Sequence, residues 1–236
     1  MPNYAAPVED LRFVLNELVD LGEIRTMPGY EEATPDVVDA ILNEAGRLAS
    51  EVLAPLNRYG DVQAPAVKDG VVTTSPEWRA AYQRFAEGGW TALIFDPEYG
   101  GQGLPRVLAV AVQEMWDASN MSFGLCPLLT CSAAEAISLQ GSEEQKRIYL
   151  TKLVSGEWAG TMNLTEPQAG SDLSAIRASA IPTDDDRHYL LSGQKIYITY
   201  GEHDLTSNIV HLVLARTPDA PEGVKGISLF VVPKFI

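Results

Sequence analysis

The spacing of apolar residues changes near residue 156, and this change constrains the fold more than any other feature of the chain. Before that point they recur every three or four positions, as in Leu11, Val14, Leu15 and Leu18, which places them on one face of a helix. From Gly156 onward, short runs rich in β-branched and aromatic residues show a period of two, which is typical of strands. The sequence therefore predicts a helical region followed by a β region.

Capping residues mark where several helices begin. Thr34-Pro35 and Ser75-Pro76 each place an N-cap residue before a proline at the first helical position, and Ser142 opens another helix. Proline and glycine gather in WTALIFDPEYGGQGLP, which predicts an ordered loop. Beyond the first helix, helices are expected over 34–53, 75–88, 105–118, 128–139 and 142–153. Strands are expected within 157–166, 174–183, 188–200, 208–217 and 225–236.

The fold class that these elements predict is α+β with more than one domain. An N-terminal helical bundle would occupy residues 1–155, with residues 1–33 as an extension, and a β domain would occupy 156–236. About five strands are too few to close a typical barrel, and the last run, ISLFVVPKFI, is still apolar at Ile236. We therefore expect an antiparallel, barrel-like but incomplete β domain, although a last strand that pairs at a sheet edge would explain the ending equally well.

The chain is acidic, with 17 Lys and Arg against 32 Asp and Glu and a formal charge of −15. Because its basic residues are scattered, a nucleic-acid partner is not expected. The apolar runs are shorter than the roughly 20 residues of a membrane span, and the acidic N-terminus is unlike an export signal. The two cysteines, Cys126 and Cys131, lie in an apolar context and are interpreted as buried hydrophobic residues rather than a disulfide. A cytoplasmic protein without membrane contact is expected.

No metal site is expected, because His188, His203 and His211 lack metal-ligand spacing with one another or with the cysteines. The segment Glu202-His203-Asp204 is interpreted as a solvated loop between strands.

Two segments of the β region carry side chains suited to a ligand. The first, TMNLTEPQAGSD at 161–172, reads as a strand running into a loop whose amides and hydroxyls are able to face a polar or anionic group. The second, GQKIYIT at 193–199, reads as a strand in which alternation puts Tyr197 and Thr199 on one face. A ring beside a hydroxyl suits a flat heteroaromatic ligand. Each segment alone also has an ordinary explanation, since such turns are common and Tyr and Thr are frequent strand residues.

Together, LTEPQAGSDLSA and the later SGQKIYIT resemble the paired signature of the acyl-CoA dehydrogenase family, roughly T-E-P-x-A-G-S-D and then G-x-K-x-W-I-T. The loop DPEYGGQG is similar to the family's P-x-x-x-G-G-x-G segment, and the ends look like a long subgroup that includes broad acyl-CoA and methylthiopropanoyl-CoA dehydrogenases. The resemblance implies an FAD-dependent oxidoreductase of fatty acid metabolism. Such an enzyme converts an acyl-CoA thioester to the trans-2-enoyl-CoA and passes electrons to an electron-transfer flavoprotein.

The resemblance also implies which residues meet the flavin. The Thr165 hydroxyl and the backbone at Leu164 would donate to its pyrimidine edge, Thr199 would lie near N5, and Tyr197 would replace the usual Trp. Ser171 would in addition touch the acyl-CoA, and Asp172 would cap the loop. The full set of expected cofactor-binding residues is Met162, Asn163, Leu164, Thr165, Gly170, Ser171, Tyr197, Ile198 and Thr199.

Besides Tyr197, the chain departs from the family pattern at three further positions and in length. Met162, Asn163 and Tyr200 replace the family's more usual residues. The family's proton-abstracting glutamate belongs to a third, C-terminal helical domain that nothing here matches, so no catalytic residue is expected in this chain. Glu166 is assigned a structural role within the T-E-P signature.

The resemblance therefore suggests the N-terminal half of a dehydrogenase, inactive alone and homo-oligomeric when full length. Two alternatives are an acyl-CoA oxidase-like relative and a non-catalytic binding or assembly module that retains the fold.

Overall fold

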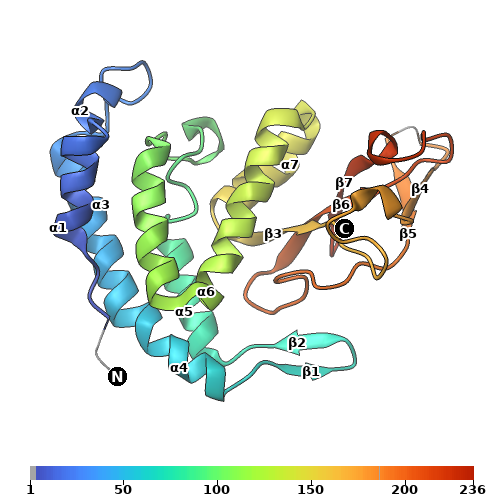
Figure 1. Cartoon of the computed structure of the whole chain (residues 1–236), viewed down its shortest axis with the longest axis horizontal. Coiled ribbons are helices and arrows are strands. Elements are labelled where there is room, and N and C mark those ends of the chain that lie inside the picture. The colour runs from blue at the N-terminus through green and yellow to red at the C-terminus, as the bar shows by residue number, and fades with distance from the viewer. Residues whose placement is uncertain (1–3, 186) are drawn as a thin grey trace.

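The structure is a computed structural model that describes residues 4–185 and 187–236. Helices form its first two thirds and most strands its last third (Figure 1). The helical part contains α1 (Val8–Phe13), η1 (Val14–Leu18), α2 (Leu21–Ile24), α3 (Pro35–Leu48), η2 (Ala49–Leu53), α4 (Ala54–Val62), α5 (Pro76–Glu87), η3 (Pro97–Tyr99), α6 (Arg106–Gln140) and α7 (Glu143–Val154).

The predicted helix starts are confirmed by their caps. The Thr34 hydroxyl accepts a hydrogen bond from the Val37 amide, and the Ser75 hydroxyl accepts one from the Trp78 amide. Ser142 forms a capping box, in which its side chain and backbone each bond to the third helical residue. These bonds satisfy amides that have no partner inside the helix.

The second predicted helix extends beyond its expected end. α3 continues through the π-helical turn η2 into α4 and ends at Val62. Pro55 explains the irregular turn, because a proline has no amide hydrogen to donate to the preceding turn of the helix.

The two helices predicted over 105–118 and 128–139 are arms of one element, α6, which bends at Asn120. Asn120 has non-helical backbone angles (φ −159°, ψ 84°). Its side-chain amide donates to the Leu53 carbonyl (3.0 Å) and accepts from the Phe123 amide (3.1 Å), so it ties the bend to η2 and caps the second arm. The arms meet at this bend in Figure 1.

By length and composition, α6 is also apolar enough to cross a membrane, a test that the core helix of a soluble protein passes as well.

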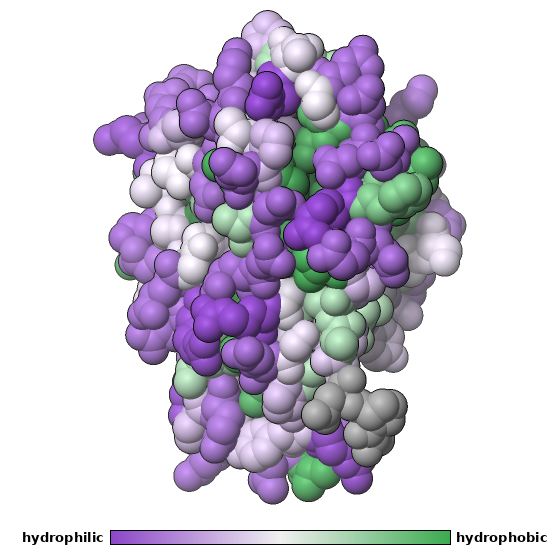
Figure 2. Space-filling view, turned by 90° about the vertical axis from the view of Figure 1, so that its left-hand side faces the viewer, coloured by the Kyte–Doolittle hydropathy of each residue, from purple (hydrophilic) through white to green (hydrophobic). Residues whose placement is uncertain are grey.

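The buried residues of α6 pack into two cores. One core lies among α3, α5, the first arm and the start of the second arm, where the Phe85 ring lies 4.7 Å from Trp116 and 5.6 Å from Phe123. The other lies between the second arm, α7 and the sheet. Figure 2 shows that the face formed by the first helices is mostly hydrophilic, with smaller hydrophobic patches.

Both cysteines are free thiols. Cys126 is buried within the first core, as expected, and Cys131 is partly buried beside the second core.

The strands of the C-terminal third form an open three-stranded sheet and a separate pair. The sheet has the order β3 (Trp158–Asn163), β6 (Asn208–Ala215), β7 (Ser228–Pro233), and the pair is β4 (Ser179–Pro182) with β5 (Tyr189–Ser192). β3 and β6 run parallel, with Thr161 beside His211, whereas β6 and β7 are antiparallel. The prediction of an antiparallel domain is therefore wrong for β3, because the long crossover through 164–207 brings the chain back in the same direction. The described strands do not close a barrel, so that part of the prediction stays unconfirmed.

The strand predicted through residue 200 ends at Ser192. Residues 193–200 form turns in which Tyr197 (φ 57°) and Tyr200 (φ 54°) take left-handed backbone angles, which non-glycine residues adopt rarely. The prediction that strand alternation aligns Tyr197 with Thr199 is therefore wrong.

A short hairpin that the prediction omitted joins α4 to α5. Its strands are β1 (Ala66–Lys68) and β2 (Val71–Thr73), and its turn is Asp69-Gly70, both with positive φ. An Asp-Gly pair between apolar residues is a recognised hairpin signal, so this element was visible in the sequence.

Candidate functional site

The first signature segment folds into a closed turn around the Glu166 carboxylate. The Glu166 amide donates to the Ala169 carbonyl (2.8 Å), and the Ala169 amide donates to the Glu166 carbonyl (3.0 Å). The carboxylate is 4% exposed. It accepts from the amides of Arg177 (2.8 Å) and Ala178 (3.0 Å) and from the Lys195 ammonium (2.8 Å).

Burial alone would raise the pKa of Glu166, but the bond from Lys195 and the backbone amides outweigh burial and hold the pKa below its usual value. Glu166 is therefore charged at neutral pH, and its oxygens are occupied. This geometry agrees with the predicted structural role and leaves no free oxygen for a general base.

Lys195 and Ile196 join the second signature segment to the first. Lys195 also donates to the Leu164 carbonyl (3.0 Å), and the Ile196 amide donates to the Thr165 carbonyl (3.0 Å). The spacing of the motifs gave no indication of this contact. Two segments about thirty residues apart therefore form one platform, with the Glu166–Lys195 ion pair beneath it.

The predicted site residues lie on the two segments of this platform and differ in how far they are exposed to solvent. Met162 packs toward the second core, and Asn163 hydrogen-bonds to Thr161. Tyr197 is 88% exposed. Asp172 caps the following turn by accepting from the Ser174 amide (2.9 Å), as predicted. The partly buried members are Met162, Asn163, Leu164, Thr165 and Ile198, and the exposed ones are Gly170, Ser171, Tyr197 and Thr199.

Several groups at the platform remain available to a ligand. Within residues 4–185 and 187–236, the hydroxyls of Thr165, Ser171 and Thr199 make no hydrogen bond to the chain. A methyl group added at Gly170 would meet no atom within 4 Å, and the backbone there does not have positive φ. Nothing in the described fold therefore requires a glycine at 170, whereas close approach of a ligand to the backbone would. Free hydroxyls, open backbone and the exposed Tyr197 ring suit a flat ligand with a polar edge.

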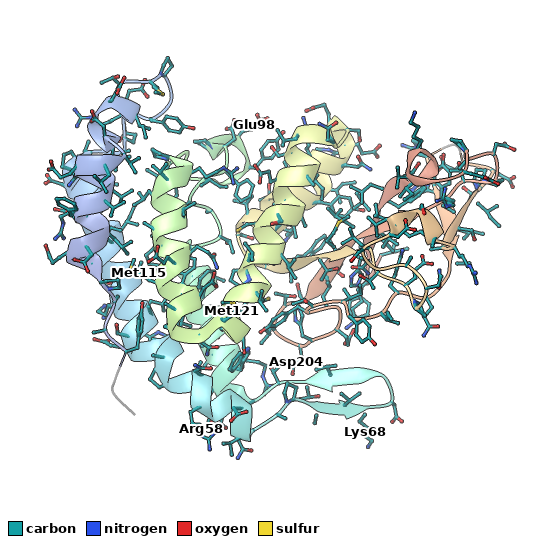
Figure 3. The ribbon with its side chains drawn as sticks, in the orientation of Figure 1. Arg58, Lys68, Glu98, Met115, Met121 and Asp204 are labelled. Carbon is teal, nitrogen blue, oxygen red and sulfur yellow. The ribbon has the colours of Figure 1, made fainter. Side chains whose placement is uncertain are left out.

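A cleft of about 1480 Å³ lies beside the platform, where α4, the hairpin, the start of α5, the bend of α6 and the loop after Thr199 meet. Figure 3 shows Asp204, Arg58 and Met121 in this region. Trp78, Leu125 and Tyr200 supply apolar and aromatic wall. Tyr200 directly follows Thr199, so the cleft reaches the end of the second signature segment.

The sequence interpretation missed two residues of this cleft. Tyr200 is held by a bond from its hydroxyl to the Ser122 carbonyl (2.6 Å). His203 is 4% exposed, so the solvated-loop interpretation is wrong for it. Its Nδ1 accepts from the Leu205 amide (3.1 Å), its Nε2 has no partner among the described residues, and burial lowers its pKa to about 4. No local sequence signal distinguishes this histidine from an exposed one.

Comparison with known families identifies the class of protein. The model of the acyl-CoA dehydrogenase N-terminal domain matches residues 37–157, and that of the acyl-CoA dehydrogenase middle domain matches residues 161–235. The chain belongs to the acyl-CoA dehydrogenase family.

Individual relatives agree with this assignment. The 3-methylmercaptopropionyl-CoA dehydrogenase of Ruegeria pomeroyi is 51% identical over 233 residues, which cover 99% of this chain and 40% of that protein. A broad-specificity linear acyl-CoA dehydrogenase of Mycobacterium tuberculosis is 32% identical over 239 residues, covering 100% of this chain and 39% of that protein. The structure of butyryl-CoA dehydrogenase from Megasphaera elsdenii superposes with a TM-score of 0.70 at 26% identity, covering 86% of this chain and 49% of that chain. The chain thus spans about two fifths of the length of the curated relatives it matches.

Proposed function

We propose that this chain is the N-terminal part of an FAD-dependent acyl-CoA dehydrogenase, which converts an acyl-CoA thioester to the trans-2-enoyl-CoA, and that it does not turn over substrate alone. The observation that carries the proposal is the contact between the two signature segments. The bonds from Lys195 to Leu164 and from Ile196 to Thr165 assemble one platform, whose hydroxyls make no hydrogen bond to the described residues of the chain.

The residues present fit a flavin. Thr165 and Thr199 offer hydroxyls, Gly170 leaves its backbone open on the side where a methyl group would point, and Tyr197 presents an exposed ring. FAD, when bound, supplies the acceptor for the hydride of the substrate. The residues proposed to hold it are Met162, Asn163, Leu164, Thr165, Gly170, Ser171, Tyr197, Ile198 and Thr199.

The contribution of this chain is then to orient the flavin and to place hydrogen-bond donors at the edge where charge develops. The Glu166–Lys195 pair and the Ile196–Thr165 bond hold the two segments that carry Thr165 and Thr199 against each other. We propose that this contact places their hydroxyls before charge develops on a ligand edge. Donors that are fixed in advance stabilise such charge without reorganisation. Ser171, exposed at the edge of the turn, would contact the acyl-CoA.

We assign the acyl portion of the substrate to the cleft beside Tyr200. Its walls include Trp78 and Leu125, which suit an apolar chain. An electron-transfer flavoprotein as acceptor, a homo-oligomeric assembly and a cytoplasmic location complete the proposal.

The test uses the longest reading frame that contains this chain, expressed and purified as a whole. We expect a yellow protein with flavin absorbance that reduces an artificial electron acceptor when acyl-CoA is added. The double variant T165V/T199V should weaken FAD binding by about tenfold or more, since it removes two donors to a ligand that gains charge. Thr151→Val, on the exposed side of α7, is the matched control.

Three outcomes separate the alternatives. Enoyl-CoA formation without peroxide supports the dehydrogenase, and peroxide release supports an oxidase-like relative. A purified protein that takes up no FAD refutes the proposal and favours a binding or assembly module.

A further inference from the structure

A row of hydrogen-bonded side chains crosses from β6 to the end of β3. The Thr161 hydroxyl oxygen lies 2.7 Å from Asn163 Oδ1 and 2.7 Å from His211 Nδ1. Thr161 is fully buried, and its two partners are partly buried. The parallel pairing of the strands, which sets Thr161 beside His211, makes the row possible.

The row lies on the face of the sheet that points away from the helices. Gly160 faces α6, because a methyl group there would lie 2.5 Å from the Ala133 side chain, and Met162 packs toward the same core. Strand alternation places Thr161 and Asn163 on the opposite face. Asn163 is the last residue of β3, so it lies on this face at the end of the strand that leads into the T-E-P turn.

The hydrogens available on each side chain decide which atom donates in the two hydrogen bonds of Thr161. The threonine hydroxyl has one hydrogen, and the amide oxygen of Asn163 only accepts, so that hydrogen points to Asn163. His211 Nδ1 must then carry a hydrogen and donate it to the Thr161 oxygen. In this arrangement the Asn163 amide has its oxygen turned to Thr161, so its NH2 group is directed elsewhere. Within the described part of the chain, that NH2 group donates to nothing.

We infer that His211 and Thr161 are positioning residues, which hold the Asn163 NH2 group as a hydrogen-bond donor to an acceptor atom of the bound flavin, a ring carbonyl oxygen or ring nitrogen. This inference rests on the proposed function. Asn163 is one of the positions at which the chain departs from the signature, where the pattern prefers a small side chain that is unable to make this bond. Burial lowers the pKa of His211, which favours the neutral ring. A neutral ring with its hydrogen on Nδ1 has none on Nε2.

The first experiment tests the row without any ligand. Nitrogen NMR of the purified protein should show His211 as the tautomer protonated at Nδ1, and Thr161→Val should shift the Asn163 side-chain amide signals. Thr161→Ser, which keeps a hydroxyl, should restore them. An Nε2-protonated tautomer of His211, or Asn163 signals that ignore T161V, would overturn the inference.

The second experiment tests what the row does. FAD is titrated into the protein expressed from the longest reading frame that contains this chain. The affinity should be about 5- to 10-fold weaker for N163D, which keeps the shape of the side chain and removes its donors, and for T161V. Both should also shift the absorption band of bound flavin, which a purely structural residue would leave in place. T161S should recover affinity and band position, and T151V on α7 should match the unaltered protein.

The outcomes separate this inference from the proposed function. Unaltered affinity and spectrum in N163D, with the Nδ1 tautomer present, would overturn the inference while FAD binding stands. Failure of the unaltered protein to bind FAD at all would refute the proposed function, and with it the flavin as the partner of Asn163.

Discussion

At the scale of single residues, Glu166 is the side chain on which the platform depends most directly. Glu166 is only 4% exposed, and its carboxylate accepts bonds from two adjacent backbone amides and from Lys195. We expect Glu166→Gln to lower the free energy of unfolding by about 3 kcal/mol near pH 7, because the change leaves the Lys195 charge buried without its partner. Urea unfolding at equilibrium measures this loss.

The pH dependence gives the same prediction a second test. The folded pKa of Glu166 lies below its ordinary value of 4.5. The contribution of its carboxylate to the free energy of unfolding is therefore fully present above pH 4.5, and it is lost as the pH falls through the lowered folded pKa. The difference between the unaltered protein and E166Q should shrink accordingly. Glu144→Gln is the control, because its pairing with Arg187 is exposed and should be worth less than about 0.5 kcal/mol. Equal losses in the two variants would contradict the role of the buried pair.

His203 should make the protein sensitive to mild acid. Burial, opposed by the weaker influence of Glu202, lowers its folded pKa to about 4 against an ordinary 6.5. Between these two pH values, His203 is protonated in the unfolded chain but neutral in the folded chain. The free energy of unfolding therefore falls as the pH drops from 6.5 to about 4. The full loss in the free energy of unfolding that comes from His203 is about 3 kcal/mol. His203→Gln should flatten this part of the stability curve, whereas His188→Gln, at an exposed turn, should not. A slope in H203Q as steep as in the unaltered protein would rule out His203 as its source.

At the scale of elements, local chemistry explains which parts of the fold were predictable. Helix starts such as Ser142 were found because a capping box is written within four residues of sequence. An interruption between residues 118 and 128 was predicted, but the bend at Asn120 was not, because it depends on a bond to Leu53, far away along the chain. The parallel pairing of β3 with β6 is likewise set by long-range packing that strand periodicity does not encode.

The candidate site was predictable in its members but not in its geometry. The motifs named the residues through a family resemblance, whereas their meeting through Lys195 and Ile196 is visible only in the structure. Tyr197 was misplaced because alternation was extended through a turn that adopts positive φ. His211 was considered only as a metal ligand and set aside, and nothing in the sequence places it beside Thr161.

Two glycines of β3 and its following turn allow the roles of packing and of ligand contact to be separated. A methyl group at Gly160 would lie 2.5 Å from the Ala133 side chain on α6, while one at Gly170 would meet nothing within 4 Å. We expect Gly160→Ala to cost about 1–3 kcal/mol through overpacking. Gly170→Ala should leave stability unchanged or slightly raised, yet weaken FAD binding. Thermal unfolding and FAD titration of both variants provide the measurement, and a G170A protein that binds FAD normally would contradict the assignment of Gly170.

At the scale of the whole molecule, Asp204 ties the C-terminal third to the helical part. Its carboxylate accepts from the Thr74 amide (2.9 Å), the Thr74 hydroxyl (2.6 Å) and the Arg79 guanidinium (2.9 Å) at the start of α5. Burial would raise the pKa of Asp204, but the bonds from Thr74 outweigh it and lower the pKa below its usual value of 3.8. The contact therefore holds at neutral pH, at one edge of the cleft.

Asp204→Ala should loosen this connection without unfolding either part. We expect a loss of about 1–3 kcal/mol, because the change leaves the Thr74 amide and hydroxyl without their acceptor, and faster amide exchange in the hairpin and in residues 200–207 than in α3. Hydrogen exchange followed by mass spectrometry resolves these segments. Asp219→Ala, in an exposed turn of the same region, is the matched control. If protection fell equally in α3 and in the hairpin, Asp204 would be acting on global stability, and the two parts would not be joined through this contact.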